Sequence, residues 1–112
     1  MDEIPNPYAA RAERLKGMEP QLVAKVRLFK TEDGGKEYPA YPGWGCPCTI
    51  TQTQPFSGYD CWPLLDQAIQ PGEERAEVGF VFRSPEAAEI MRRAGRFYLR
   101  EGKCVGEAIV IT

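Results

Sequence analysis

The chain has 112 residues, of which 43% are hydrophobic and 27% are charged, and its formal net charge at pH 7 is −2. This length supports one domain with a single modest core, and the hydrophobic content is too high for a disordered protein. The small net charge gives no global reason to expect binding to nucleic acid or to an anionic membrane, so such binding would need a local patch.

The absence of histidine from the sequence limits the chemistry that the chain can perform. Histidine is the commonest general base in proteins, so hydrolases of the Ser-His and Cys-His types are excluded. No glycine-rich loop followed by Lys-Ser or Lys-Thr is present, which excludes nucleotide binding of the P-loop kind. We therefore expect a protein that is not an enzyme, binds no nucleotide and carries no cofactor.

Residues 1–20 are expected to form an N-terminal extension of a domain at residues 21–112. Residues 8–16 are rich in Ala, Arg, Glu and Leu, which is typical of a short helix. The extension lacks the apolar core of a signal peptide, and no run in the chain is long enough to span a bilayer. We therefore expect a cytoplasmic protein without a membrane partner.

Apolar and polar residues alternate through the segment LVAKVRL, with Ala24, Val26 and Leu28 on one face, which predicts a half-buried strand. The sequence Asp-Gly-Gly at residues 33–35 is a signal for a hairpin turn after this strand. Residues 38–48 (YPAYPGWGCPC) are rich in proline and glycine and predict an irregular loop or a broken edge strand.

Residues 48–54 predict the next strand, in which Cys48 and Ile50 share a face. Residues 55–73 are expected to form a long connection with aromatic anchors. The segment AEVGFVFR alternates again and predicts a strand. One face of this strand carries Val78, Phe80 and Phe82.

The segment SPEAAEIMRRAG at residues 84–95 predicts the one well-marked helix. Ser84 suits the N-cap, Pro85 the first helical position and Gly95 the C-terminal cap. Residues 96–111 predict a closing β-hairpin with a charged tip. Five or six strands with one inserted helix predict a mainly all-β fold, as a small antiparallel barrel or sandwich.

The four cysteines are candidate ligands for a structural metal: Cys46, Cys48, Cys61 and Cys104. A zinc site built from four thiolates needs no histidine. The usual knuckle has two residues between ligands, however, and only Pro47 separates the first pair. Positions two apart on a strand face the same side, so buried or unreactive thiols are the favoured interpretation.

Several segments, in their order and spacing, resemble the C-terminal β-barrel domain of translation elongation factor Tu and its relatives. The resemblance begins at VAKVRLFKTEDGGKEYPAYPGW and continues through CTITQTQPFSG and IQPGE. It is clearest in RFYLREGKCVGEAIV, where the residues that fit the family's closing pattern are Arg96, Phe97, Arg100, Glu101, Gly102, Val105 and Gly106.

The resemblance implies a six-stranded antiparallel Greek-key β-barrel. In the full factor this barrel is the third domain, and it contacts the T stem of aminoacyl-tRNA and the exchange factor. A glycine turn beside cations suits phosphate or ribose contacts because the backbone can approach closely. The matching positions, with one neighbouring cation added, are Gly35 and Lys36 in the first turn and Arg100, Glu101, Gly102 and Lys103 in the last.

The sequence also departs from the family. Gly45, Cys46, Pro47 and Cys48 stand where the family has an Arg-Pro-Gln step, and the helix at residues 84–95 lies where the family has a looser connection. The chain carries neither the GTPase domain nor the second barrel of the factor, so we do not expect it to act as an elongation factor by itself.

The first hypothesis for the function is a stand-alone binding module that contacts tRNA, another RNA or a translation component. Lys and Arg outnumber Glu in residues 11–30 and 84–103, which predicts either solvated faces or one basic face that grips phosphates.

The second hypothesis is a protein-interaction or regulatory module without RNA binding, which holds a protein partner or forms a homo-oligomer. It predicts an exposed apolar patch around Trp44, Phe56, Tyr59 and Trp62. A metal- or thiol-dependent protein that uses the four cysteines is a third interpretation.

Overall fold

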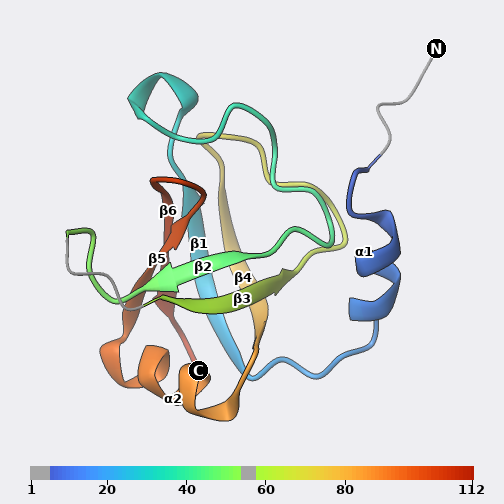
Figure 1. The fold of residues 1–112 in the computed structure, drawn as a ribbon, viewed down its shortest axis with the longest axis vertical. Coiled ribbons are helices and arrows are strands. Elements are labelled where there is room, and N and C mark those ends of the chain that lie inside the picture. The colour runs from blue at the N-terminus through green and yellow to red at the C-terminus, as the bar shows by residue number, and fades with distance from the viewer. Residues whose placement is uncertain (1–5, 54–57) are drawn as a thin grey trace.

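The computed structural model describes residues 6–53 and 58–112 (Figure 1). The described residues form six strands that close into an antiparallel barrel in the order β1-β4-β3-β2-β5-β6, which confirms the predicted mainly all-β barrel. The strands are β1 (Leu22–Leu28), β2 (Cys46–Thr49), β3 (Tyr59–Leu64), β4 (Glu74–Phe82), β5 (Arg96–Arg100) and β6 (Cys104–Val110). The helical elements among these residues are α1 (Ala9–Leu15), the 3-10 turn η1 (Thr31–Asp33) and α2 (Pro85–Ala94).

The barrel interior is filled by side chains from alternate strand positions, as the period-two patterns predict. The inward-facing residues of β1 are buried, and so are Val78, Phe80 and Phe82 of β4. Phe80 of β4 and Phe97 of β5 meet edge to face, with ring centroids 5.2 Å apart, which is a favoured geometry for an aromatic pair. This contact joins strands that are not neighbours in the barrel.

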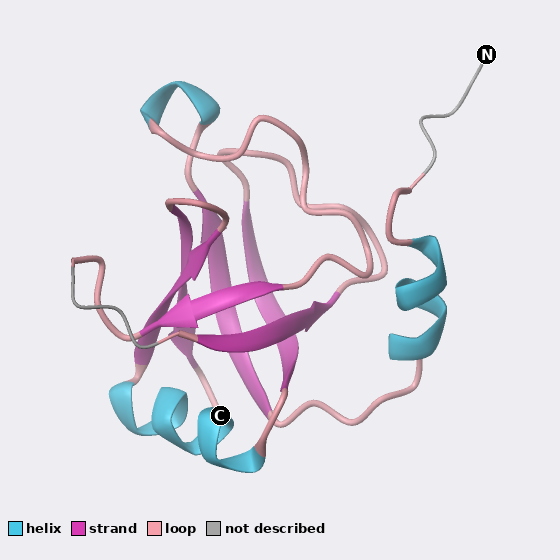
Figure 2. Cartoon of the chain, in the orientation of Figure 1, coloured by secondary structure: helices cyan, strands magenta, loops and turns pink. Residues whose placement is uncertain are grey.

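α2 lies at one end of the barrel, close to the C-terminus (Figure 2). Its predicted caps are confirmed: the Ser84 hydroxyl accepts a hydrogen bond from the backbone N–H of Ala87 at 3.2 Å, and Gly95 has a φ of 78°. The buried face of the helix packs against the core of the barrel through Ala87, Ala88 and Met91.

α1 lies at the side of the barrel (Figure 2), and none of its residues is buried. Asn6 donates a side-chain hydrogen bond to the carbonyl of Pro42 at 2.8 Å, and Arg11 donates one to the carbonyl of Gly43 at 3.0 Å. A Cβ atom at Gly43 would lie 2.5 Å from the carbonyl oxygen of Tyr8, so this close approach requires glycine. Among the residues described, no helix combines the length and the apolar character that a bilayer crossing requires.

The predicted hairpin turn at residues 33–35 is wrong. β1 pairs with β4 and β6 rather than with the next strand along the chain. Residues 31–33 form η1, and Gly34 ends it with a φ of 95° and donates its N–H to the carbonyl of Thr31. The glycines therefore open a long connection at the end of the barrel opposite α2 (Figure 1).

The strand predicted at residues 48–54 begins and ends earlier than expected. β2 starts at Cys46, where it pairs with Cys61 of β3, and it ends at Thr49. Ile50 lies beyond the strand with 48% of its surface exposed, so it does not share a buried face with Cys48. Residues 54–57 of the predicted strand and connection lie outside the described part of the chain.

β3 lies inside the segment that was expected to be a connection. Its inward-facing residues, Cys61 and Pro63, pair with Phe82 and Phe80 of β4. Its outward-facing Trp62 is itself apolar, so the strand has no clear alternation of polar and apolar residues. The pairing with β4, rather than a local pattern, therefore defines this strand.

Candidate functional site

The first and the last predicted turns meet through Lys36 and Glu101. The ammonium group of Lys36 donates hydrogen bonds to both carboxylate oxygens of Glu101, each at 2.8 Å. The indole Nε1 of Trp44 donates a third hydrogen bond, to Oε2 of Glu101 at 2.8 Å. The Lys36 Nζ also lies 4.8 Å from the centroid of the Trp44 ring, within the range of a cation–π contact. We call these three residues the Lys36 cluster.

Burial divides the Lys36 cluster into an inner and an outer part. Only 4% of the Lys36 side chain is exposed, whereas 46% of the Glu101 side chain reaches solvent. Desolvation acts to raise the pKa of Glu101, but the hydrogen bonds from Lys36 and Trp44 outweigh it and hold this pKa below its ordinary value. The cluster is therefore an ion pair at neutral pH, with the carboxylate on the outside.

The backbone conformation of the two turns requires glycine at Gly35 and favours it at Gly102. A Cβ atom at Gly35 would lie 2.1 Å from the carbonyl oxygen of Phe29, so only glycine fits beside that backbone. Gly102 has a φ of 74°, in the left-handed region that favours glycine. The close approach at Gly35 and the left-handed conformation of Gly102 set the backbone positions of Lys36 and Glu101.

The two remaining predicted site residues lie on either side of Glu101 and Gly102. Arg100 ends β5, where it is half-buried and pairs with Cys104 of β6. Lys103 is exposed in the turn, and its carbonyl accepts a hydrogen bond from the Glu101 N–H at 2.8 Å. The predicted residues of both turns thus lie at the same end of the barrel. The Lys36 side chain, however, is buried in an internal contact with Glu101.

A hollow of about 340 Å³ lies over the Lys36 cluster. We call it the tyrosine hollow, and its lining residues are Pro7, Tyr8, Lys36, Tyr38, Pro39, Tyr41 and Glu101. Tyr38 is 68% exposed. Between the tyrosines of the connection, Ala40 is buried and exchanges backbone hydrogen bonds with Ile69 at 2.9 and 3.0 Å, which anchors this segment to the barrel.

The sequence prediction did not include the tyrosines of this hollow. The spacing of the segment YPAYP was a usable signal, because prolines fix the backbone while the tyrosines on either side of Ala40 remain available to face outward. The contribution of Tyr8 had no local signal, since it depends on the docking of the N-terminal segment against Pro42 and Gly43.

Three of the four cysteines form a buried cluster on the neighbouring strands β2 and β3. The Sγ atoms of Cys46 and Cys61 are 4.0 Å apart, and the Cys48 thiol donates to the carbonyl of Tyr59 at 3.1 Å. Hydrogen bonds with Cys46 and Cys48, together with burial, raise the pKa of Cys61 well above its ordinary value. Cys104 lies apart on β6 and donates to the carbonyl of Gly106. Within residues 6–53 and 58–112, no group of metal-ligating side chains is arranged to hold a metal ion.

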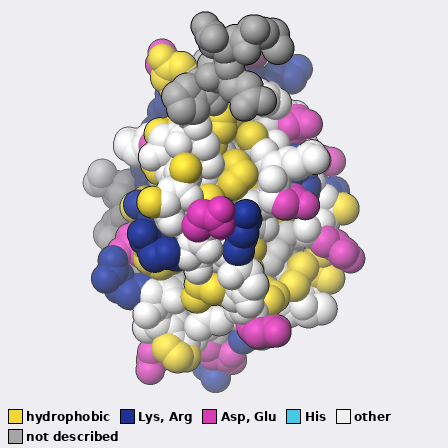
Figure 3. Space-filling model, turned by 90° about the vertical axis from the view of Figure 1, so that its right-hand side faces the viewer, with side chains coloured by type: hydrophobic (Ala, Val, Ile, Leu, Met, Phe, Trp, Pro, Cys, Tyr) yellow, Lys and Arg dark blue, Asp and Glu magenta, His cyan; other side chains and the backbone are white. Residues whose placement is uncertain are grey.

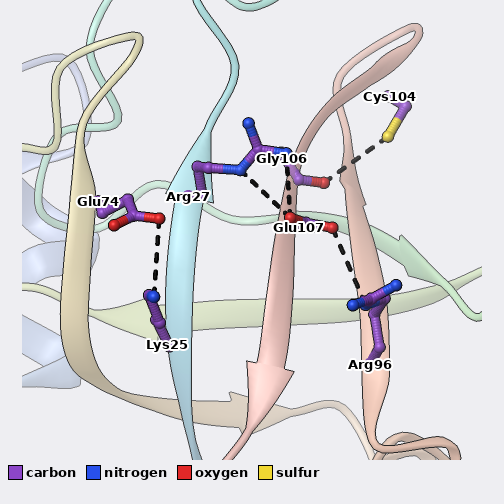
Figure 4. Close-up of polar contacts among 7 residues, drawn as sticks. All are labelled: Lys25, Arg27, Glu74, Arg96, Cys104, Gly106 and Glu107. Atoms are coloured by element: carbon purple, nitrogen blue, oxygen red, sulfur yellow. Dashed lines mark hydrogen bonds and ion pairs between the residues drawn. The ribbon is translucent and has the colours of Figure 1, made fainter.

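Carboxylates balance the basic side chains that project from β1 (Figure 4). Lys25 pairs with Glu74 of β4 at 3.7 Å, and Arg27 pairs with Glu107 of β6 at 3.0 Å. Arg96 of β5 approaches the other oxygen of Glu107 at 3.9 Å. The face that carries α1 likewise mixes charged side chains of both signs with hydrophobic ones (Figure 3). Neither face presents charge of a single sign.

The exposed apolar patch predicted around Trp44, Phe56, Tyr59 and Trp62 is wrong at Trp44. Trp44 is buried to 1% exposure, with its indole N–H turned to Glu101. Tyr59 and Trp62 are half-buried on β3, and Phe56 lies outside the described residues. The exposed aromatic surface of the site is instead the tyrosine hollow.

The chain was also compared with known proteins. No protein-family model matches it, and no curated protein matches it at a significant level.

Proposed function

We propose that the chain is a non-enzymatic module that binds a protein partner at the tyrosine hollow. The observation that carries this proposal is the internal neutralisation of Lys36, whose ammonium group is buried against Glu101. The charge below the hollow is therefore balanced, and the side chains around it are mainly aromatic and prolyl. A surface whose centre is rich in aromatic residues and poor in unbalanced charge is typical of protein interfaces.

Binding of tRNA or another RNA is the competing proposal, and it rests on Arg100 and Lys103 of the last turn. A phosphate clamp needs cations that reach the ligand, and the ammonium group of Lys36 is turned inward to Glu101. Single-stranded RNA stacks on aromatic side chains, but the sites that bind it combine those side chains with a positively charged groove. The balanced charge of the tyrosine hollow favours a protein.

We also propose that the barrel is related to the third domain of elongation factor Tu. The strand order supports a Greek-key description, because β1 lies beside β4 and is joined to β2 by a long connection. The contact between Lys36 and Glu101 adds support, since both occupy positions that match the family's turns. In this proposal the chain shares the barrel but uses the first turn to support a protein-binding surface.

The proposal is tested by capture from an extract of the native host, followed by reconstitution with the purified captured protein. The test variants are Tyr38→Ala and Tyr41→Ala, and the control is Ile50→Ala, which removes another exposed apolar side chain away from the hollow. We expect each tyrosine variant to weaken binding about tenfold or more, as truncation of an interface anchor does, and the control to bind like the wild type.

A parallel titration with total tRNA at low salt decides between the two proposals. Retention of tRNA that falls with rising salt and with Lys103→Ala, but not with Tyr38→Ala, would overturn the protein-binding proposal in favour of RNA. Reconstituted binding of the captured protein that is equally strong in both tyrosine variants would overturn it as well.

A further inference from the structure

We propose that the tyrosine hollow binds a proline-rich segment of its partner in the polyproline II conformation, with a lysine or arginine of that segment next to Glu101. This inference rests on the proposed function, because it names the chemistry of the partner at the same site. It is carried by the volume and composition of the hollow, by its hydrogen-bonding groups and by the arrangement of charge in the Lys36 cluster.

The lining of the tyrosine hollow matches the surface of a polyproline helix. Grooves that recognise proline-rich segments are lined by aromatic side chains, against whose flat faces the prolyl rings pack. Here the aromatic rings come from Tyr8, Tyr38 and Tyr41, and Pro7 and Pro39 also line the hollow. The volume of about 340 Å³ lies at the small end of the usual range for ligand sites, so it suits a few side chains of an extended peptide rather than a folded domain.

The hydrogen-bonding groups of the hollow also match such a peptide. A polyproline helix makes no internal hydrogen bonds, and each proline lacks an N–H, so the peptide offers carbonyl acceptors but few donors. Within the part of the chain that the structure describes, the hydroxyl groups of Tyr38 and Tyr41 make no hydrogen bond, so they are able to donate to these carbonyls. The donors of Lys36 and Trp44 are already directed to Glu101.

The exposed carboxylate of Glu101 favours a cationic residue beside the prolines of the peptide. Glu101 is the solvent-facing member of the ion pair, with 46% of its side chain exposed against 4% for Lys36. Its low pKa keeps it ionised at neutral pH. A cationic side chain of the partner therefore meets a carboxylate at the edge of the hollow, whereas an acidic side chain would be repelled.

The inference is tested by titrating the isotope-labelled chain with synthetic peptides and following backbone amide chemical shifts. The first peptide has eight prolines followed by arginine, the second replaces the arginine with glutamate, and the third has the arginine after eight alternating glycines and serines. We expect saturable shifts at the amides of residues 36–38, 40, 41 and 101 with the first peptide, binding weakened several-fold by the glutamate, and no saturation with the third.

Variants of the labelled chain assign these shifts to the hollow. Tyr38→Ala removes a side chain that is 68% exposed, so the fold is expected to survive, and circular dichroism checks this. We expect Tyr38→Ala and Tyr41→Ala to weaken binding of the first peptide about tenfold, and Ile50→Ala to leave it unchanged. Absence of saturable shifts with the first peptide, shifts centred away from the hollow, or equal binding of the third peptide would each overturn the inference.

A competition experiment separates this inference from the proposed function. If a captured partner needs Tyr38 and Tyr41 but is not displaced by the proline peptide, the inference fails while the protein-binding function stands. If neither the partner nor the peptide needs the tyrosines, both fail. Displacement of the partner by the proline–arginine peptide, with loss of both interactions in the tyrosine variants, supports both.

Discussion

Lys36 is a buried cation whose position depends on a single carboxylate. A buried ion pair adds little net stability compared with a well-packed apolar pair, but loss of one partner leaves the other charge without compensation. In this chain the exposed member is Glu101, and the buried member also has the face of the Trp44 ring nearby. A substitution at Glu101 should therefore destabilise the fold more than a substitution of a half-exposed residue usually does.

The first prediction concerns the substitution Glu101→Gln. It keeps the size of the side chain but removes the negative charge beside the buried Lys36 ammonium. We expect a loss of about 2 kcal/mol in the free energy of unfolding, below the 3–5 kcal/mol typical of a fully buried pair because Glu101 is half exposed. Urea denaturation followed by tryptophan fluorescence measures this loss.

The matched control is Glu89→Gln on α2, which removes a carboxylate paired with Arg92 and Arg93 on the surface. Surface pairs of this kind contribute little, so we expect this variant to unfold near the wild-type midpoint. The double variant Lys36→Met with Glu101→Gln should recover part of the lost stability, because no buried charge remains. If Glu101→Gln unfolds as the wild type does, the ion pair has no energetic role.

The second prediction is the pH dependence of this effect. The pKa of Glu101 in the folded chain lies below its value in the unfolded chain, which is about 4.3 for an unperturbed glutamate. Its contribution is thus fully present above that value and is lost as the pH falls through the folded pKa. Thermal melts from pH 7 to pH 3 should show the gap between the wild type and Glu101→Gln narrowing on the acid side. A gap that stays constant over this range would contradict the prediction.

At the scale of elements, the connection from β1 to β2 is the part of the chain that builds the site. It leaves β1, forms η1, passes Lys36, anchors at Ala40 through Ile69 and reaches Trp44. Its backbone hydrogen bonds and its close approaches fix the position of the ammonium group more than any regular secondary structure does. A backbone change in this connection should therefore move Lys36.

The third prediction tests this dependence with Gly35→Ala. The added Cβ would lie 2.1 Å from the carbonyl oxygen of Phe29, so the backbone has to shift. We expect a loss of about 3 kcal/mol, at the upper end of ordinary point mutations, together with changed amide shifts at Lys36 and Glu101.

The control is Gly102→Ala, where the new Cβ meets no atom within 4 Å and only the φ of 74° opposes it. A cost of about 1 kcal/mol is expected there. If the two variants lose the same free energy of unfolding, the close contact with Phe29 is not the reason for the loss in Gly35→Ala.

Local patterns were sufficient to predict those elements whose sequence repeats with a clear period. The alternation in β1 reflects one buried face, the apolar positions Val78, Phe80 and Phe82 of β4 point into the core, and the caps of α2 are properties of Ser84 and Gly95 themselves. β3 could not be found in this way, because Trp62 makes its outer face apolar as well. The boundaries of β2 depend on pairing with β3 across the barrel, which no local signal reports.

The candidate site was predictable only in part, for a related reason. The resemblance marked both turns, but the ion pair joins residues 65 positions apart in the sequence, so their contact follows from barrel closure alone. The same closure turns the Lys36 side chain inward. The residue that the sequence predicted as a phosphate contact therefore has a structural role. The tyrosines were missed because two different segments, at Tyr8 and at Tyr38, have to meet before a hollow exists.

At the scale of the whole molecule, a closed barrel carries a helix at its side that contributes little to its core. α1 buries none of its residues, and it is held mainly by the hydrogen bonds of Asn6 and Arg11 to the connection and by the partial packing of Tyr8. The N-terminal segment nevertheless supplies Pro7 and Tyr8 to the tyrosine hollow. Removal of the N-terminal segment should therefore weaken binding at the hollow more than it destabilises the fold.

The fourth prediction is that a chain beginning at Gln21 folds as the barrel alone. Because α1 has no buried residue, we expect its removal to cost about 1–2 kcal/mol, and the melt to remain a single cooperative transition. Binding at the tyrosine hollow should weaken more than stability does, because two of its lining residues are lost. Circular dichroism melts measure the first effect, and the partner or peptide titration measures the second. Loss of cooperative melting would show that the extension belongs to the folding unit.

Closure of the barrel also bears on how the chain behaves at high concentration. Every one of the six described strands has a hydrogen-bonded neighbour on both sides, so none of these six is an edge strand on which another molecule could extend the sheet. The shortest seam is the one between β2 and β5, which is held at Cys48 and Thr49. The barrel would therefore open first at this seam, and strand exchange between two molecules would have to begin there.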